Sequence, residues 1–181
     1  IATVGVIGSG TMATGIAEVF AKAGYAVTLV ARSQDKLDAV RNSLLRSQAK
    51  QVERGRLTAD EADAVIARVT GSTQRASLAD ADLIGEAIAE DLAIKSGLFR
   101  ELDTICKPGA ILATTTSSLP IIELAAVTSR PGDVIGMHFF NPAQIMRLVE
   151  VVHTVATDPA VVATTVALSR KVGKVPVQCG D

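Results

Sequence analysis

GSGTMA, at residues 8–13, separates two apolar runs that differ in period. Thr3–Gly8 before it is rich in residues typical of strands, and Met12–Ala23 after it has helical spacing that ends at Gly24. Ala26–Ala31 is a second strand-like run. A strand, a tight turn, a helix and a strand within about 30 residues make a βαβ unit, so we expect an α/β fold with parallel strands.

The glycine turn itself has the pattern of a phosphate-binding loop. Gly8 allows a tight turn, Gly10 lets a pyrophosphate approach the backbone, and Ala13 is small enough for close packing of helix on strand. The start of the helix, at Thr11 and Met12, offers unpaired N–H groups and a partial positive charge. The flanking strand and helix are the context that the motif requires. We expect Gly8, Gly10, Thr11 and Met12 to bind a dinucleotide; the alternative is a glycine turn in an unrelated α/β domain.

The end of the second strand predicts which dinucleotide is preferred. An NAD site usually has an acidic residue here, which accepts a hydrogen bond from the ribose 2′-hydroxyl. This chain has Ala31, Arg32 and Ser33 instead, and Lys36 follows one turn later. A guanidinium pairs with a 2′-phosphate and a carboxylate repels it, so we expect NADP(H) to be favoured over NAD(H), with Arg32, Ser33 and Lys36 at the ribose. The alternative is that Arg32 is a solvated loop cation.

Two helices in succession interrupt the alternation of strands and helices. Gln34–Arg54 is a long charged helix that ends at Gly55, and Thr58 with Glu61 predicts a capping box at the start of Ala59–Ala67. Such a pair is an insertion in the plain doubly wound plan. It either contributes to a substrate site or is a purely structural hairpin.

The rest of the chain alternates short strands with longer helices, which is the pattern of a parallel sheet with crossover helices. We expect one domain, residues 1–181, with a Rossmann-type, doubly wound and mostly parallel sheet that carries an inserted helical hairpin. The remaining strands are expected at Val69–Ser72, Ala81–Ala87, Ala110–Thr115, Asp133–Phe139, Leu148–His153 and Val175–Cys179, and the remaining helices at Ala93–Ile105, Ile121–Ala126 and Ala160–Val172.

Composition excludes several classes of function. Hydrophobic residues make up 48% of the chain but aromatic residues only 3%, which fits buried parallel strands under Ala-rich helices. The net charge of −1 gives no reason to expect a nucleic acid or a membrane surface as a partner. No apolar run is long enough to span a bilayer, and Cys106 and Cys179 form neither a metal-ligand spacing nor a disulfide framework. We expect no metal site and a reduced, cytoplasmic setting.

Two polar residues near the later strands suggest acid–base chemistry. His138 is one of only two histidines, and an imidazole, with an ordinary pKa near ~6.5, suits a base that takes a hydroxyl proton near neutral pH. Glu150 lies far enough along the chain for a neighbouring strand to bring it alongside. A carboxylate on the distal ring nitrogen would fix the tautomer and stabilise the imidazolium. The alternative is that His138 is a core histidine with satisfied hydrogen bonds.

Four further motifs narrow the interpretation. They are EAIAE at 86–90 with Lys95 after it, TSSL at 116–119, GMHFFNP at 136–142 and MRLVEV at 146–151. Together with the glycine turn they resemble the 3-hydroxyacyl-CoA dehydrogenase family, over essentially the whole chain. The resemblance implies an oxidoreductase of fatty acid metabolism that interconverts 3-hydroxyacyl and 3-ketoacyl thioesters by hydride transfer, with a substrate such as 3-hydroxybutyryl-CoA.

The resemblance also implies roles for individual residues. It gives His138 and Glu150 the base and orienting roles above, and Ser117 a hydrogen bond to the substrate oxygen near the nicotinamide. Ser43 and Lys50, on the inserted hairpin, match positions near the CoA nucleotide. The positions implied for the nicotinamide half of the dinucleotide are Ala87, Glu90, Lys95 and Asn141. Simpler roles remain open: Ser117 or Ser118 could cap a helix before Pro120, and Glu90 could be a solvent-facing acid at a helix start.

Three departures from the family pattern bear on this interpretation. Ala31 stands where the family usually has an acid, and Thr115 where an Asn commonly precedes the TSS run. The family also continues into a helical C-terminal domain, absent here, that carries a further catalytic Asn, closes the substrate cleft and supplies most of the contact of a homodimer.

Other functions remain open beside an acyl-CoA dehydrogenase activity. An enzyme of the same fold could act on an acyl-carrier-protein thioester or on a free hydroxy or keto acid. A catalytically silent dinucleotide-binding module is a different class of function. A silent module would need none of Ser117, His138 and Glu150, so the enzyme is favoured.

Overall fold

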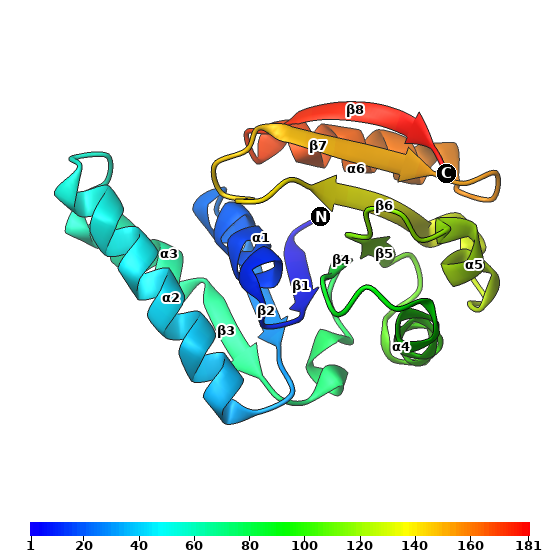
Figure 1. Ribbon diagram of the computed structural model, residues 1–181, viewed down its shortest axis with the longest axis horizontal. Helices are drawn as coiled ribbons and strands as arrows, with labels where there is room; N and C mark the ends of the chain where they lie inside the picture. The colour runs from blue at the N-terminus through cyan, green and yellow to red at the C-terminus, as the bar shows by residue number, and fades with distance from the viewer.

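The computed structural model describes every residue from 1 to 181 (Figure 1). Its strands are β1 (Thr3–Ile7), β2 (Ala26–Val30), β3 (Val69–Ser72), β4 (Leu83–Glu86), β5 (Ile111–Thr114), β6 (Val134–Phe139), β7 (Leu148–His153) and β8 (Val175–Gly180). Its helices are α1 (Thr11–Lys22), α2 (Gln34–Glu53), α3 (Ala59–Ala67), α4 (Leu92–Ile105), α5 (Ile121–Ala126) and α6 (Pro159–Lys171), with short 3-10 turns at Arg75–Leu78 and Pro131–Asp133.

All strands belong to one sheet, in the order β3-β2-β1-β4-β5-β6-β7-β8. The strands from β3 to β6 are parallel, β7 runs antiparallel to β6, and β8 runs parallel to β7. The strand order reverses between β1 and β4. In open α/β sheets, ligands bind at such a switch point, outside the carboxyl ends of the strands. The predicted doubly wound, mostly parallel sheet is therefore confirmed.

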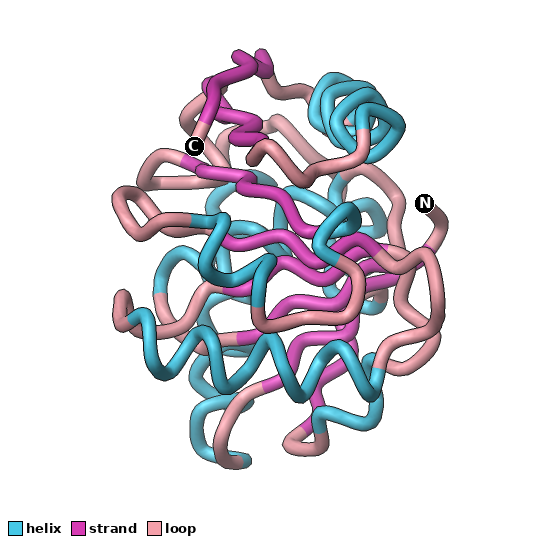
Figure 2. Tube along the Cα trace, turned by 90° about the vertical axis from the view of Figure 1, so that its right-hand side faces the viewer, coloured by secondary structure: helices cyan, strands magenta, loops and turns pink.

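Helices cover both faces of the sheet (Figure 2). Each face has its own apolar core. One core lies under α1, α2, α3 and α6, and the other under α4 and α5. Along β6, Ile135, Met137 and Phe139 face the first core, whereas Val134 faces the second. Because side chains alternate along a strand, His138 lies on the same face as Val134.

The inserted hairpin consists of α2 and α3, which project from the β3 side of the sheet (Figure 1). Leu37, Val40 and Leu44 are buried at helical spacing and hold α2 against the sheet. The predicted capping box at the start of α3 is present in both directions: Thr58 N–H donates to Glu61 Oε2 at 2.8 Å, and Glu61 N–H donates to Thr58 Oγ1 at 3.2 Å.

The largest difference from the predicted boundaries is in the strand expected at Ala81–Ala87, which spans Leu83–Glu86. Ala81 is excluded because its N–H donates to the carbonyl of Leu78 in a turn, at 3.0 Å, and not to a neighbouring strand. None of the helices combines the length and the apolar character that crossing a lipid bilayer requires.

Candidate active site

The glycine turn lies at the carboxyl end of β1, beside the end of β4. Gly8 has a φ of +131°, which residues with a side chain rarely adopt. A Cβ at this position would lie 2.4 Å from the carbonyl oxygen of Ala87. The Gly8 N–H donates to the carbonyl of Val30 at 3.0 Å, which ties the turn to β2. Glycine therefore lets three chain segments meet at the switch point of the sheet.

Gly10 has a different role, as the N-cap of α1. It has no side chain to cap the helix, and no neighbouring atom lies within 4 Å of the position that its Cβ would take. The first turn of α1, with Thr11 and Met12, contains no acidic side chain. The free N–H groups of this turn therefore keep their partial positive charge unopposed. This backbone cradle fits the pyrophosphate of a dinucleotide.

The residues after β2 form a cationic rim beside the turn. Ala31 is buried, whereas Arg32 and Lys36 are exposed and form no ion pair. Ser33 Oγ accepts from the Lys36 N–H at 3.4 Å and so caps α2. Asp35 lies in the same first turn of α2 and partly offsets the positive charge. The side chains of Arg32 and Lys36 remain available to an anion.

The predicted base and its carboxylate face each other across the antiparallel strands β6 and β7. His138 lies directly opposite Glu150, and its Nδ1 is 2.7 Å from Glu150 Oε2. A carboxylate can only accept, so we assign the ring proton to Nδ1, which leaves the lone pair of Nε2 free. The ring is half-buried rather than in the apolar core. The imidazole is thus held in the tautomer that a general base needs.

Ser117 extends this line of polar groups to the end of β5. Its hydroxyl is 3.2 Å from Nε2 of His138 and donates to the free lone pair. The Ser117 N–H donates to Glu90 Oε1 at 3.0 Å, and the Thr116 hydroxyl donates to the same oxygen. Burial alone raises the pKa of Glu90, but these hydrogen bonds and the charge of Lys95 outweigh it and hold that pKa below its usual range. Glu90 is therefore an ionised partner of the loop at residues 116–118, called the TSS loop below, and not a free surface acid.

The side chain of Lys95 does not reach the surface of the molecule. It is fully buried, and its Nζ lies 2.6 Å from Glu86 Oε1 and 3.5 Å from Glu90 Oε2. Sequence reasoning missed Glu86 and also Thr114, whose hydroxyl donates to Glu86 Oε2 at 2.7 Å. One signal was available: Glu86 ends an apolar strand, and a buried carboxylate needs a charged partner.

Neither Ser117 nor Ser118 caps α5, so the simpler role considered for them is wrong. The first N–H groups of the helix, those of Ile121 and Ile122, donate to the carboxylate of Asp181 at 3.0 and 2.7 Å. This cap comes from the far end of the chain. The Ser117 hydroxyl is therefore available to the site.

The β6–β7 loop, which begins near Asn141, is held against α1. Ala143 is buried, and a Cβ at Gly15 of α1 would lie only 3.1 Å from the Ala143 Cβ. From the other side, the buried Lys174 donates to the carbonyls of Ala143 and Met146. The exposed Asn141 is thus carried by a loop whose position relative to α1 is fixed.

Ser43 and Lys50 lie on α2, apart from the line formed by Ser117, His138 and Glu150. Ser43 is half-buried and Lys50 is exposed, and no hydrogen bond or ion pair joins either of them to the TSS loop or to the β6–β7 hairpin. The structure therefore does not bring these two residues together with the predicted catalytic residues.

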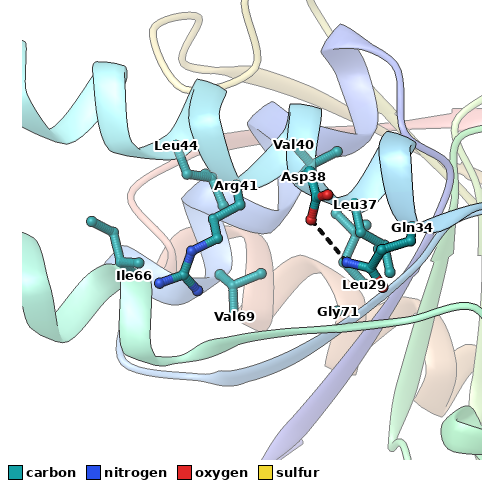
Figure 3. Close-up of a pocket in the computed structure, with 10 residues that line it drawn as sticks. All are labelled: Leu29, Gln34, Leu37, Asp38, Val40, Arg41, Leu44, Ile66, Val69 and Gly71. Atoms are coloured by element: carbon teal, nitrogen blue, oxygen red, sulfur yellow. Dashed lines mark hydrogen bonds between the residues drawn. The ribbon is translucent and has the colours of Figure 1, made fainter.

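A separate hollow lies between α2, α3 and β3, and Figure 3 shows it. It has a volume of about 160 Å³, and the side chains of Gln34 and Asp38 form a 2.8 Å hydrogen bond in its wall. Its remaining lining residues are Leu29, Leu37, Val40, Arg41, Leu44, Ile66, Val69 and Gly71. None of the predicted site residues lines it, so it is a packing groove rather than the candidate active site.

Comparison with known proteins identifies the family. Residues 3–181 match the family described as "3-hydroxyacyl-CoA dehydrogenase, NAD binding domain". A 3-hydroxybutyryl-CoA dehydrogenase of Mycobacterium tuberculosis is 43% identical over 98% of this chain and 63% of its own length. A 3-hydroxyadipyl-CoA dehydrogenase of Escherichia coli is 43% identical over 98% of this chain and 37% of its own length.

A solved structure agrees with these matches. The (S)-3-hydroxybutyryl-CoA dehydrogenase of Ralstonia eutropha superposes with a TM-score of 0.98 at 36% identity, over 100% of this chain and 64% of that one. This chain thus spans less than two thirds of the length of these relatives. The match over residues 3–181, the likeness of fold and the motifs all agree, and the chain belongs to the 3-hydroxyacyl-CoA dehydrogenase family as its NAD-binding domain.

Proposed function

We propose that the protein carrying this chain is a 3-hydroxyacyl-CoA dehydrogenase that interconverts 3-hydroxyacyl and 3-ketoacyl thioesters, with 3-hydroxybutyryl-CoA as a representative substrate. The observation that carries the proposal is the unbroken line from Ser117 through His138 to Glu150. The names of the relatives, which include 3-hydroxybutyryl-CoA and 3-hydroxyadipyl-CoA dehydrogenases, support the thioester class.

We assign each residue of the line a step. When bound, the nicotinamide ring supplies the acceptor for the hydride of the substrate. His138 takes the proton of the 3-hydroxyl on Nε2, because its Nδ1 already carries a proton. Glu150, 2.7 Å from Nδ1, stabilises the imidazolium that forms. Ser117 exchanges its hydrogen bond to Nε2 for one to the substrate oxygen, and so positions that oxygen beside the base.

The dinucleotide is proposed to lie across the switch point of the sheet. The backbone cradle at the start of α1 would hold the pyrophosphate, because its N–H groups are free and unopposed. Lys95 would act on the nicotinamide half only by holding Glu90. The residues proposed to contact the dinucleotide are Gly8, Gly10, Thr11, Met12, Arg32, Ser33, Lys36, Ala87, Glu90 and Asn141.

A turnover assay of the complete protein tests the activity. With acetoacetyl-CoA and reduced dinucleotide, we expect the absorbance of the reduced nicotinamide to fall in proportion to the enzyme added. If only an acyl-carrier-protein thioester or a free keto acid is turned over, that compound and not the acyl-CoA thioester is the substrate. Tight dinucleotide binding with no turnover of any of the three would favour a silent module.

We further propose that Arg32 tilts the cofactor preference towards NADP(H). Arg32 is exposed and unpaired at the position where the adenosine ribose should lie, and Ala31 supplies no carboxylate there. A charge-assisted hydrogen bond contributes about 1.5–3 kcal/mol, but solvent exposure and the neighbouring Asp35 reduce that value. We expect NADPH to bind about tenfold more tightly than NADH at low salt, and the preference to shrink as salt rises.

Dissociation constants for NADPH and NADH at low and high salt decide the preference. Arg32→Asp should reverse it towards NADH. Arg46→Asp is the matched control, since Arg46 is an exposed arginine further along α2 and should not affect the ratio. Equal affinity of the unaltered protein for the two dinucleotides at low salt would make Arg32 a solvated loop cation.

The relatives continue beyond the region that matches this chain. We propose that a corresponding helical domain completes the substrate cleft and the homodimer in the complete protein. Val177 pairs with Glu150 in the register, so Val175 and Val177 share the face of the catalytic pair, and both are about half exposed. A helical domain over this face would exclude water from the base. Ser43 and Lys50 would contact the CoA nucleotide from the hairpin. We expect the 181-residue chain to bind dinucleotide but turn over little acetoacetyl-CoA, and full activity would show that the cleft needs no second wall.

A further inference from the structure

Glu86 has no part in the mechanism above, although it forms a buried ion pair with Lys95 next to the site. Glu86 ends β4, Lys95 lies in α4, and both side chains are at most 1% exposed. Lys95 Nζ donates to Glu86 Oε1 at 2.6 Å, and the Ile88 N–H donates to the same oxygen at 2.8 Å. The Thr114 hydroxyl donates to Glu86 Oε2 at 2.7 Å. Both oxygens of the carboxylate are therefore engaged, and its position is fixed from three directions.

A continuous series of contacts leads from this pair to the base. Lys95 Nζ is 3.5 Å from Glu90 Oε2. The other oxygen of Glu90 accepts from the Ser117 N–H at 3.0 Å, and the Ser117 hydroxyl is 3.2 Å from His138 Nε2. The orientation of Ser117 therefore depends on where the carboxylate of Glu90 points.

Glu90 is subject to two competing attractions. One of its oxygens holds the TSS loop, and the other faces the ammonium of Lys95. An unpaired ammonium in a buried setting would attract the remaining carboxylate strongly, because charge interactions strengthen as the surrounding polarity falls and an unpaired buried charge is costly. Glu86, 2.6 Å away, already neutralises that ammonium.

We propose that Glu86 is a positioning residue, which neutralises Lys95 and so leaves Glu90 free to hold Ser117 in line with His138. The geometric part of this inference concerns the chain alone. Its consequence for turnover rests on the proposed function.

The first test uses Glu86→Gln in the 181-residue chain, without ligand. With the charge of Lys95 unmatched, Glu90 should turn towards it and release Ser117. The ring-nitrogen chemical shifts of His138 should then move. Those of His153, the only other histidine, at the end of β7, should stay and serve as an internal reference.

Glu18→Gln is the matched control, because Glu18 is also a buried glutamate paired with a lysine. Its carboxylate is 2.7 Å from Lys22 Nζ and accepts from the Ser47 hydroxyl at 2.9 Å, on the α1–α2 side of the molecule. This variant should leave both histidines unchanged. If Glu86→Gln moves the His138 signals no more than Glu18→Gln does, the proposal is overturned.

A charge-balanced double variant keeps the proposal testable even if E86Q fails to fold. E86Q/K95Q removes the carboxylate and the ammonium together, so nothing draws Glu90 away from Ser117. We expect His138 signals close to those of the unaltered chain. Displaced signals in a folded E86Q/K95Q chain would mean that charge balance at Lys95 does not position Ser117, and would overturn the proposal.

Turnover of the complete protein separates this inference from the proposed function. Because a misplacement of about 1 Å can cost roughly a hundredfold in rate, E86Q should lower kcat by about ten- to a hundredfold, and E18Q should not. Displaced His138 signals with undiminished turnover would contradict the catalytic role of the Ser117–His138 line. Unmoved signals would contradict the positioning role of Glu86 alone.

Discussion

The glycine turn after β1 and the β6–β7 hairpin would serve the proposed site by opposite means. The turn offers backbone N–H groups, and Gly8 and Gly10 are useful there because they have no side chain. Strands β6 and β7 of the hairpin have ordinary extended backbone, and the role proposed for them depends on the side chains of His138 and Glu150. The two regions should therefore be sensitive to opposite substitutions. The turn should be damaged by substitutions that add a side chain, and the hairpin by substitutions that remove one.

The largest effect is expected from removal of the base. In the complete protein, His138→Ala should lower kcat at least ~10²-fold, because general-base catalysis typically contributes about 10²–10⁴-fold. Dinucleotide affinity should stay within a few-fold, since the cradle is built elsewhere. Steady-state kinetics and fluorescence titration measure the two quantities, with His153→Ala as the control. Near-normal turnover of His138→Ala would remove this residue from the mechanism.

An added methyl group at Gly8 should damage the fold itself. Alanine there would be strained by the φ of +131°, and its Cβ would lie 2.4 Å from the carbonyl oxygen of Ala87. Strain of the backbone alone costs about 1–3 kcal/mol, so Gly8→Ala should lower the free energy of unfolding by at least that amount. Urea denaturation measures it, and an unchanged midpoint would show that the turn can relax.

The same change at Gly10 should affect binding and not folding. Gly10 has a φ of −81°, and an added Cβ would meet no atom within 4 Å. The free energy of unfolding should change by less than about 1 kcal/mol. A Cβ in the path of the pyrophosphate should weaken dinucleotide binding about tenfold, which equals ~1.4 kcal/mol. Unchanged affinity in isothermal titration would place the pyrophosphate away from Gly10.

The smallest effect is expected from pH, at Glu90 in the loop between β4 and α4, whose side chain accepts from the Ser117 N–H beside the hairpin. The pKa of Glu90 is held below its ordinary value of 4.5, so the ionised carboxylate stabilises the fold fully above that value, and this contribution is lost as the pH falls through the lowered pKa. The stability difference between the unaltered chain and Glu90→Gln should therefore shrink on acidification. Denaturation at several pH values tests this, with exposed Glu53→Gln as control. A constant difference would contradict it.

The parts of the site that sequence predicts well are those encoded by short spacings. The glycine turn is recognisable because the strand, the turn and the helix follow one another directly. Glu150 lies beside His138 because two adjacent strands bring it there, as predicted. Such arrangements follow from the local periodicity of strands and helices.

The parts that sequence does not predict depend on contacts between distant residues. The resemblance to the family predicts Lys95 at the cofactor, but its ammonium faces Glu86, and only the packing of α4 on β4 decides that. Thr114 is 28 positions from Glu86, and Asp181 is 60 positions from Ile121, so no local pattern reveals either contact. Periodicity shows that these residues are buried or lie at a helix end, but not which partner satisfies them.

The antiparallel pairing of β6 and β7 has a consequence for the order in which the site can form during folding. His138 and Glu150 are separated by 12 positions, so closure of one short hairpin brings them together. The contact between Glu90 and Ser117 spans 27 positions and requires a completed parallel crossover. Because the entropic cost of closing a loop grows with its length, low-contact-order pairs tend to form first. We therefore expect the base and its carboxylate to meet before the serine that aligns the substrate is in place.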